Sequence, residues 1–357
     1  MSSFVAAFVL ISESLPTHRR AFGTNSAENG YGIGIALSAL ISYLNPTWKS
    51  YITTAYLVPA LISLFLTLTF IDESPKWLLQ KNKYEEVSIL IRKIFKSNRV
   101  KIPCSIECRI EEMQQWQPGE FTKDPTIVDQ LVSVPFWHLF RRKKTAFRMI
   151  ILAFIWITCV AVYYGLLFGP ELFKISIHFF FMINGLSVLP GNALQLILAT
   201  NFGRKPALMT NLILTGAFLI LGVVLPRDGY WILAIYFVAC GSFLTITASF
   251  ATVYMWHGEL MPTNMRAIGI GLGSLTGRFC GIFIPLVKKV LEQYSKQLPV
   301  YFLAGLTFAC AILALAIPET LNQLMPDNIE EYECFGTIEY TKIKNKRQAL
   351  IQSATEA

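Results

Sequence analysis

One arginine stands in the middle of an apolar segment, where a charge is costly. Arg278 lies twelve residues after Arg266, about 18 Å along a helix, which puts it near the middle of a bilayer. An arginine at that depth normally faces a cavity or a partner of opposite charge. We favour a site for the carboxylate of a small ligand over a structural pair with a buried acid.

A second charge, Glu28, also falls inside an apolar segment. It either binds a cation or proton or satisfies a neighbouring polar group such as Asn25, and both interpretations remain open. Four glycines at four-residue spacing, from Gly269 to Gly281, flank Arg278 and predict close approach by another helix.

Charged residues also form a motif that occurs twice. The pattern Glu-x-x-Pro-Thr-x-x-Arg-Ala-x-Gly starts at Glu13 and again at Glu259, an offset of 246 residues. The same offset separates Glu73 from Glu319, each at the end of an apolar run. Two matches at one offset indicate an internal duplication, and parallel repeats of membrane helices build one large class of secondary transporters.

These motif charges lie at the ends of apolar segments, where ion pairs can close one face and break as two halves rock. The alternative is static anchoring of loops at the headgroup layer. We predict a cytoplasmic gate made of Glu13, Arg20, Glu73, Arg204, Glu259, Arg266 and Glu319.

The elements that carry these residues are apolar runs of membrane-spanning length. The segment 1–12 is half that length and resembles the end of a helix. The sequence therefore predicts an all-α membrane protein with eight full transmembrane helices and a partial first one. The full spans are expected near 22–44, 51–71, 148–168, 177–199, 207–225, 230–252, 267–288 and 299–317.

Composition and charge agree with a membrane protein. Hydrophobic residues make up 54% of the 357 residues and charged residues 15%. The net charge of +8 comes largely from residues 76–148, which hold 15 of the 31 Lys and Arg residues. The positive-inside rule places such a stretch in the cytoplasm, so we expect the bilayer and no nucleic acid as partner. The seven cysteines and four histidines form no framework or ligand set, so no disulfide, metal or cofactor is expected. The histidines, His257 among them, are expected at surfaces.

Four segments are expected along the chain. Residues 1–72 are the remnant of an N-terminal half bundle, and 148–318 form a complete six-helix C-terminal half. Between them, residues 73–147 form a cytosolic loop with an amphipathic helix from Lys83 to Lys96, its apolar face made by Val87, Leu90, Ile91 and Ile94. Residues 319–357 are a cytosolic, partly ordered tail. If the halves match in length, three to four helices are missing before residue 1, and the chain alone is expected to transport poorly.

The motifs together resemble the major facilitator superfamily, and within it the organic ion transporter family of solute carriers. The resemblance covers about residues 1–335 and has the chain begin inside the family's fourth helix. The matching stretches are 73–79, 163–166, 203–206, 259–266 and 318–327.

The resemblance implies a ligand cavity and its residues. Arg278 matches a position that is Arg in organic anion and carnitine carriers and Asp in cation carriers. Aromatic residues match cavity positions, where they suit flat organic ions. Asn192 stands where anion carriers commonly have a basic residue. Thr200 stands three residues before Gly203, where the superfamily's loop motif between two helices usually has an Asp. The implied substrate site comprises Arg278, Glu28, Trp156, Tyr163, Tyr164, Asn192 and Phe250.

The predicted function is transport of small organic ions, anions or zwitterions preferred, by alternating access in a multi-pass protein of the plasma membrane. A sugar or neutral-solute facilitator is the first alternative. Sugar carriers should have a Gln-rich run in the seventh helix, whereas this chain has Ile155-Trp156-Ile157-Thr158 there. An organic cation carrier and a non-transporting truncated membrane protein are the others. An enzyme is not expected, because the short loops hold no nucleophile–base or metal constellation.

Overall fold

A computed structural model of the chain describes most of its apolar segments. The described residues are 10–11, 20–45, 47–73, 75, 78, 83–102, 143–167, 176–226, 229–261, 265–321, 323, 326, 329–336 and 340. Every regular element in these ranges is a helix, in agreement with the all-α prediction. The chain divides into one unit of residues 1–27 with 45–132 and another of residues 28–44 with 133–357.

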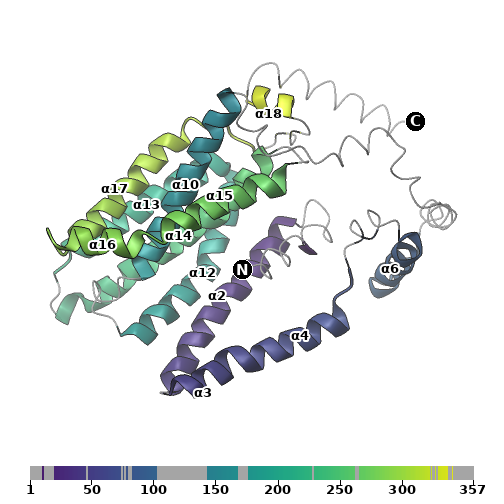
Figure 1. Cartoon of the computed structure of the whole chain (residues 1–357), viewed down its shortest axis with the longest axis horizontal. Helices are drawn as coiled ribbons and strands as arrows, with labels where there is room; N and C mark the ends of the chain where they lie inside the picture. Colours follow the sequence, from purple (N-terminus) through teal and green to yellow (C-terminus); the bar gives the residue numbers. More distant parts are fainter. Residues whose placement is uncertain are drawn as a thin grey trace. The chain divides into compact units, whose positions relative to one another are not determined.

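The second unit is a bundle of long helices that run side by side (Figure 1). All six spans predicted between residues 148 and 317 fall on its helices. The bounds are α10 (Lys143–Leu167), α12 (Ile177–Asn201), α13 (Arg204–Val224), α14 (Ile232–Leu260), α15 (Arg266–Gly281), α16 (Ile284–Glu292) and α17 (Leu298–Ala314). The unit also holds residues 28–44 of α2 (Arg20–Leu44) and the short helices η4 (Gly229–Trp231) and α18 (Ile329–Cys334).

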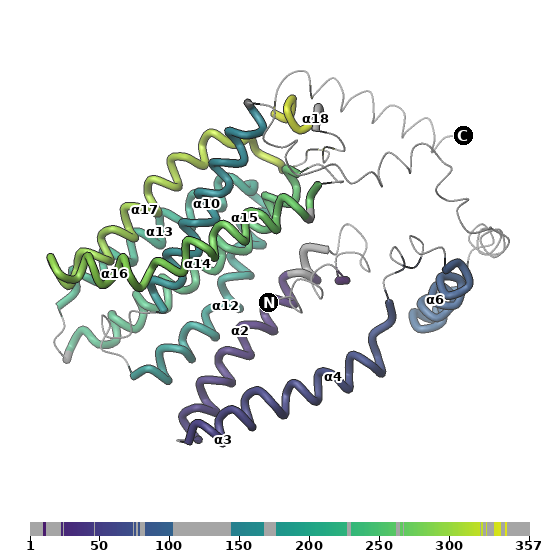
Figure 2. Tube along the Cα trace, in the orientation of Figure 1, coloured from purple at the N-terminus to yellow at the C-terminus, as the bar shows by residue number. Residues whose placement is uncertain are grey.

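The span predicted over 267–288 is one apolar segment of membrane-spanning length, Ile268–Glu292, but its helix is interrupted. The helix is interrupted at Ile282 and Phe283, which join α15 to α16 (Figure 2). Pro285 stands in the first turn of α16, and it has no N–H to donate to the carbonyl of Gly281 four residues earlier. The proline therefore starts a new helix.

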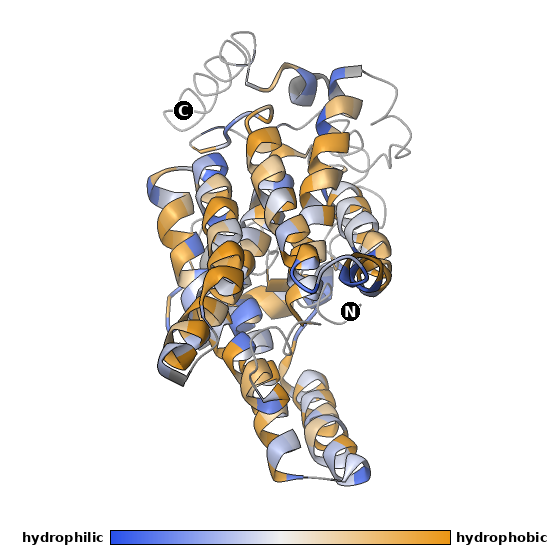
Figure 3. Cartoon of the chain, turned by 90° about the vertical axis from the view of Figure 1, so that its left-hand side faces the viewer, coloured by the Kyte–Doolittle hydropathy of each residue, from blue (hydrophilic) through white to orange (hydrophobic). Residues whose placement is uncertain are grey.

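Six helical segments in the described part of the chain are long and apolar enough to cross a membrane. They are Trp48–Phe70, Lys144–Leu167, Ile177–Asn201, Arg204–Val224, Ile232–Leu260 and Ile268–Glu292. Of the other two predicted spans, α17 is apolar but has 17 residues, and α2 has 25 residues that include polar ones. Apolar residues run along the outer faces of the bundle helices (Figure 3), as lipid contact requires.

The glycine stripe packs α15 against α10, as its spacing predicts. An added Cβ would lie 2.6 Å from Trp156 Cδ1 at Gly273 and 2.9 Å from Val160 at both Gly277 and Gly281. Only glycine allows this separation of the two backbones. The same device joins α2 to α12, where a Cβ at Gly185 would lie 2.5 Å from the Ala36 nitrogen.

The segment after α17 contributes to the bundle core, which the sequence did not lead us to expect. Tyr332, Phe335 and Tyr340 are each at most 3% exposed and pack with the N-terminal half of α10. Arg148 of α10 donates to the carbonyl oxygens of Tyr332 and Phe335, the latter at 2.8 Å. Burial raises the pKa of the Tyr332 hydroxyl, and the nearby Arg148 charge opposes that rise.

The first unit holds a continuous helix and an amphipathic one. The former runs through α3 (Trp48–Ile52), the π-helix η2 (Thr53–Leu57) and α4 (Val58–Phe70), and none of its side chains is buried. The latter, α6 (Tyr84–Ser97), lies where the apolar periodicity predicts a helix. Val87 and Leu90 of α6 are buried with Leu78, whereas Ile94 is 43% exposed, so the predicted apolar face ends one turn early.

Candidate functional site

Aromatic side chains of α10 and α14 form a cluster in the second unit. Trp156 packs edge-on against Tyr254, with ring centroids 4.5 Å apart, and against Phe250 at 5.8 Å. Tyr163 lies two turns further along α10, 6.2 Å from Phe250 and 5.9 Å from Tyr164. The structure thus brings together four predicted aromatic residues and adds Tyr254, which sequence reasoning missed. Trp156 itself is fully buried behind the other rings.

Arg278 reaches this cluster from α15. Its guanidinium lies 3.4 Å from the Tyr254 hydroxyl and 3.4 Å from the Ser274 carbonyl of its own helix. None of the ion pairs among the described residues includes Arg278. Its side chain is partly exposed, so a guanidinium with donors to spare lies beside an aromatic surface.

The expectation that His257 is a surface group is wrong. His257 lies on α14, is fully buried, and accepts a hydrogen bond at its Nδ1 from Trp156 Nε1 at 2.9 Å. A polar group buried in a membrane bundle is costly unless it is hydrogen-bonded. His257 stands in an apolar run next to Trp256, but such a run does not show which of its side chains are buried.

Asn192 and Glu28 lie on facing helices, α12 and α2. Asn192 is 1% exposed and donates from Nδ2 to Oδ1 of Asn29 at 2.9 Å. Glu28 precedes Asn29 on α2 and is partly buried. Asn184, two turns before Asn192, donates to the Tyr163 hydroxyl at 3.4 Å. Polar groups therefore extend from the aromatic cluster to the α2–α12 contact.

The predicted gate residues of α13 and α14 form an ion pair at one end of the bundle. Arg204 Nη2 lies 2.7 Å and its Nε 2.9 Å from the two carboxylate oxygens of Glu259. Thr320 donates its hydroxyl to the same carboxylate at 2.5 Å. Both charged side chains are less than 20% exposed, so the bidentate geometry holds in a partly desolvated place.

Glu319 joins this network through backbone groups. Its carboxylate accepts from the N–H groups of Arg204 and Lys205, each at 2.9 Å, and so caps the N-terminus of α13. Gly203 immediately before has φ of 107°, and a Cβ there would lie 2.7 Å from the Glu319 carboxylate. The tight turn before α13 thus has a glycine at its positive-φ position and a cap from Glu319.

The other four predicted gate residues are Glu13, Arg20, Glu73 and Arg266. Glu13 lies outside the described residues, and Arg20 is described only as the first residue of α2. Glu73 belongs to the other unit and is exposed, and Arg266 begins α15 with its side chain partly buried.

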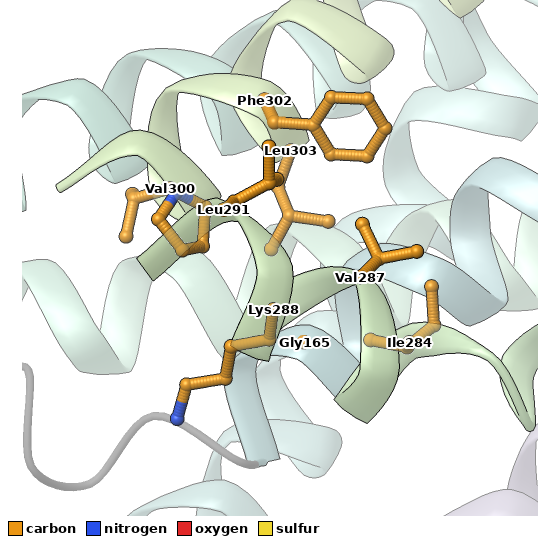
Figure 4. Close-up of a pocket in the computed structure, with 9 residues that line it drawn as sticks. Gly165, Ile284, Val287, Lys288, Leu291, Val300, Phe302 and Leu303 are labelled. Atoms are coloured by element: carbon orange, nitrogen blue, oxygen red, sulfur yellow. The ribbon is translucent and has the colours of Figure 1, made fainter. Parts of the chain in front are cut away.

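A groove opens elsewhere in the bundle, at the C-terminal end of α10 (Figure 4). It is lined by apolar side chains and by Lys288, whose ammonium lies 3.6 Å from Glu292. None of its lining residues belongs to the predicted substrate site. Within the described ranges no group of His, Cys, Asp and Glu side chains could hold a metal ion.

A bundle of long apolar helices with a mid-helix arginine and a charge network at one end is the architecture of a polytopic membrane protein. The sequence matches the Major Facilitator Superfamily over residues 2–285, and the chain belongs to that family. It is a multi-pass membrane protein, and the resemblance drawn from its motifs is confirmed.

Two curated relatives illustrate the similarity. The chain is 30% identical over 337 residues to an organic cation transporter protein of Drosophila melanogaster, covering 93% of this chain and 59% of that protein. It is 29% identical over 332 residues to the human organic cation/carnitine transporter 2, covering 93% and 57%. The chain thus spans less than two thirds of the relatives it matches.

The fold is similar to that of a solved transporter. The partially occluded, inward-open xylose transporter XylE from E. coli aligns with a TM-score of 0.58 at 19% identity, covering 88% of this chain and 67% of XylE. At that identity the likeness concerns the fold alone.

Proposed function

We propose that this protein transports small organic ions across the plasma membrane by alternating access, with anions or zwitterions preferred. The observation that carries the proposal is Arg278, a mid-helix guanidinium beside aromatic rings with no ion-pair partner among the described residues. A structural arginine at that depth would have a buried acid beside it. A substrate carboxylate supplies the missing charge.

The aromatic residues give the site its shape. Phe250 and Tyr163 offer ring faces and edges to a flat organic ion, and Trp156 supports them from behind. Tyr164, Asn192 and Glu28 would extend the site toward α2, with the Asn29–Asn192 bond joining the two sides.

The charge network would hold one face of the bundle closed in one state. The Arg204–Glu259 pair links α13 to α14, and Thr320 and Glu319 tie the end of α17 to both. Breaking these contacts as two halves rock would open that face. The attraction between these two charges is screened less by water than in a fully exposed pair, because both side chains are less than 20% exposed.

An organic cation carrier is the second candidate. It is favoured by the names of the two relatives and by Glu28, a carboxylate inside α2. Arg278 argues against it, because a fixed guanidinium repels a cation at the site.

Uptake measurements test the proposal. The protein, expressed from its complete open reading frame in oocytes, is offered a labelled organic anion, an organic cation, carnitine and a hexose. We expect saturable uptake of the anion or of zwitterionic carnitine, competed by unlabelled substrate. Saturable uptake of the hexose alone, or of none of the four, would refute the proposed function.

A further inference from the structure

A histidine that no predicted role uses lies directly behind the proposed substrate site. His257 is fully buried between α14, α10 and α15, and its Nδ1 accepts the Trp156 indole N–H at 2.9 Å. Because an indole nitrogen can only donate, Nδ1 must be the unprotonated nitrogen and the imidazole proton is on Nε2. Nε2 has no hydrogen-bond partner in the described part of the chain.

The glycines of α15 make room for this pair. A Cβ at Gly273 would lie 2.6 Å from Trp156 Nε1 and 3.0 Å from His257 Cε1, and one at Gly269 would lie 3.5 Å from His257 Nε2. The indole and imidazole therefore fill the space above two residues without side chains. Neither ring can turn far without striking the α15 backbone.

The pair is connected to Arg278 through one further ring. Trp156 stands edge-on to Tyr254 at 4.5 Å, with an interplanar angle of 83°, and the Tyr254 hydroxyl lies 3.4 Å from Arg278 Nη2. Contacts thus run from His257 to Trp156, then to Tyr254 and Arg278. A change in the tilt of the Trp156 indole would press on the Tyr254 ring, whose hydroxyl contacts the guanidinium.

We propose that His257 is a positioning residue for substrate binding, which fixes the Trp156 indole and thereby the Tyr254–Arg278 contact. The inference rests on the proposed function, since it assigns His257 a role in the same site. His257 touches no substrate in this arrangement. Its effect reaches the ligand through Trp156.

A double-mutant cycle in the uptake assay tests the inference. His257→Leu removes the acceptor at similar volume, Trp156→Phe removes the donor, and His257→Gln restores an acceptor oxygen. We expect His257→Leu to raise the KM for the transported ion about 3- to 10-fold, the effect of one net hydrogen bond. The maximal rate per molecule at the surface stays within about twofold. His257→Gln recovers most of the loss.

The cycle separates positioning from general support of the bundle. In the Trp156→Phe background, His257→Leu should change the KM by less than about twofold, because the bond is already absent. His178→Leu, which removes a partly exposed histidine of α12, is the matched control and should leave the KM unchanged. Equal effects of His257→Leu in both backgrounds, or no effect in either, would overturn the inference. Absence of uptake by the unmodified protein would instead refute the proposed function itself.

Discussion

Among single carboxylates of the bundle, we expect Glu319 to contribute most to the free energy of unfolding. It accepts four backbone hydrogen bonds, from Arg204 and Lys205 at 2.9 Å, Thr320 at 2.8 Å and Leu321 at 3.0 Å. Glu319→Ala removes the cap of α13, worth about 0.5–2 kcal/mol, and a favourable charge at a helix N-terminus, worth about 0.3–1 kcal/mol. The N–H groups left without an acceptor add to this, so we expect a loss of about 2–4 kcal/mol.

Thermal unfolding in detergent measures this loss. Glu319→Ala should lower the midpoint by about 5–12 °C for a bundle of this size, and Glu319→Gln by less, because one acceptor oxygen remains. Glu292→Ala is the matched control, since the Glu292 side chain is 39% exposed and lies 3.6 Å from Lys288. Its removal should cost under about 0.5 kcal/mol. A midpoint for Glu319→Ala equal to that of Glu292→Ala would show that the cap does not stabilise α13.

Three further predictions concern packing, the tail and topology. Gly277→Val should cost about 1–3 kcal/mol in the same unfolding assay, because a Cβ there lies 2.9 Å from an α10 side chain. Gly271→Val, with nothing within 4 Å, should cost under about 0.5 kcal/mol, and equal losses would contradict the α10–α15 packing. Arg148→Ala should speed proteolysis of the C-terminal segment about tenfold or more, since it loses two charge-assisted hydrogen bonds to that segment; an unchanged cleavage rate would show that the arginine does not hold the segment. An impermeant thiol reagent should label Cys104 and Cys334 only in permeabilised cells, and labelling in intact cells would reverse the predicted orientation.

The sequence predicts those parts of the fold that depend on hydropathy alone. Long apolar runs, a basic stretch and repeated charge motifs predicted the helices and the family. Pro285 removes a helical hydrogen bond and so could have predicted the interruption after Gly281. The hydropathy of the segment is continuous, however, and hydropathy alone predicts one span. The docked segment after α17 was not predicted, since three aromatic residues in a polar stretch form no period that marks a buried face.

The candidate site was predicted by residue type but not by pairing. The sequence singled out Arg204 and Glu259, yet nothing in it indicates that they pair with each other across 55 positions. His257 was misjudged because a histidine in an apolar run has no periodic signal, and its burial depends on Trp156, which lies 101 positions away. Such contacts depend on how helices pack, which residue spacing within one helix does not determine.

Charge reversal at Arg278 tests most directly whether this residue binds the substrate carboxylate. Uptake of a matched organic anion and organic cation is measured for the unmodified protein, Arg278→Lys and Arg278→Asp, at equal surface expression. A charge-assisted hydrogen bond of about 1.5–3 kcal/mol corresponds to a loss of about 10- to 150-fold in anion uptake for Arg278→Asp, with partial retention in Arg278→Lys. We predict that loss together with an unchanged or increased uptake of the cation. Anion uptake that is the same in Arg278→Asp as in the unmodified protein would contradict the proposed role of Arg278 and leave it a structural residue.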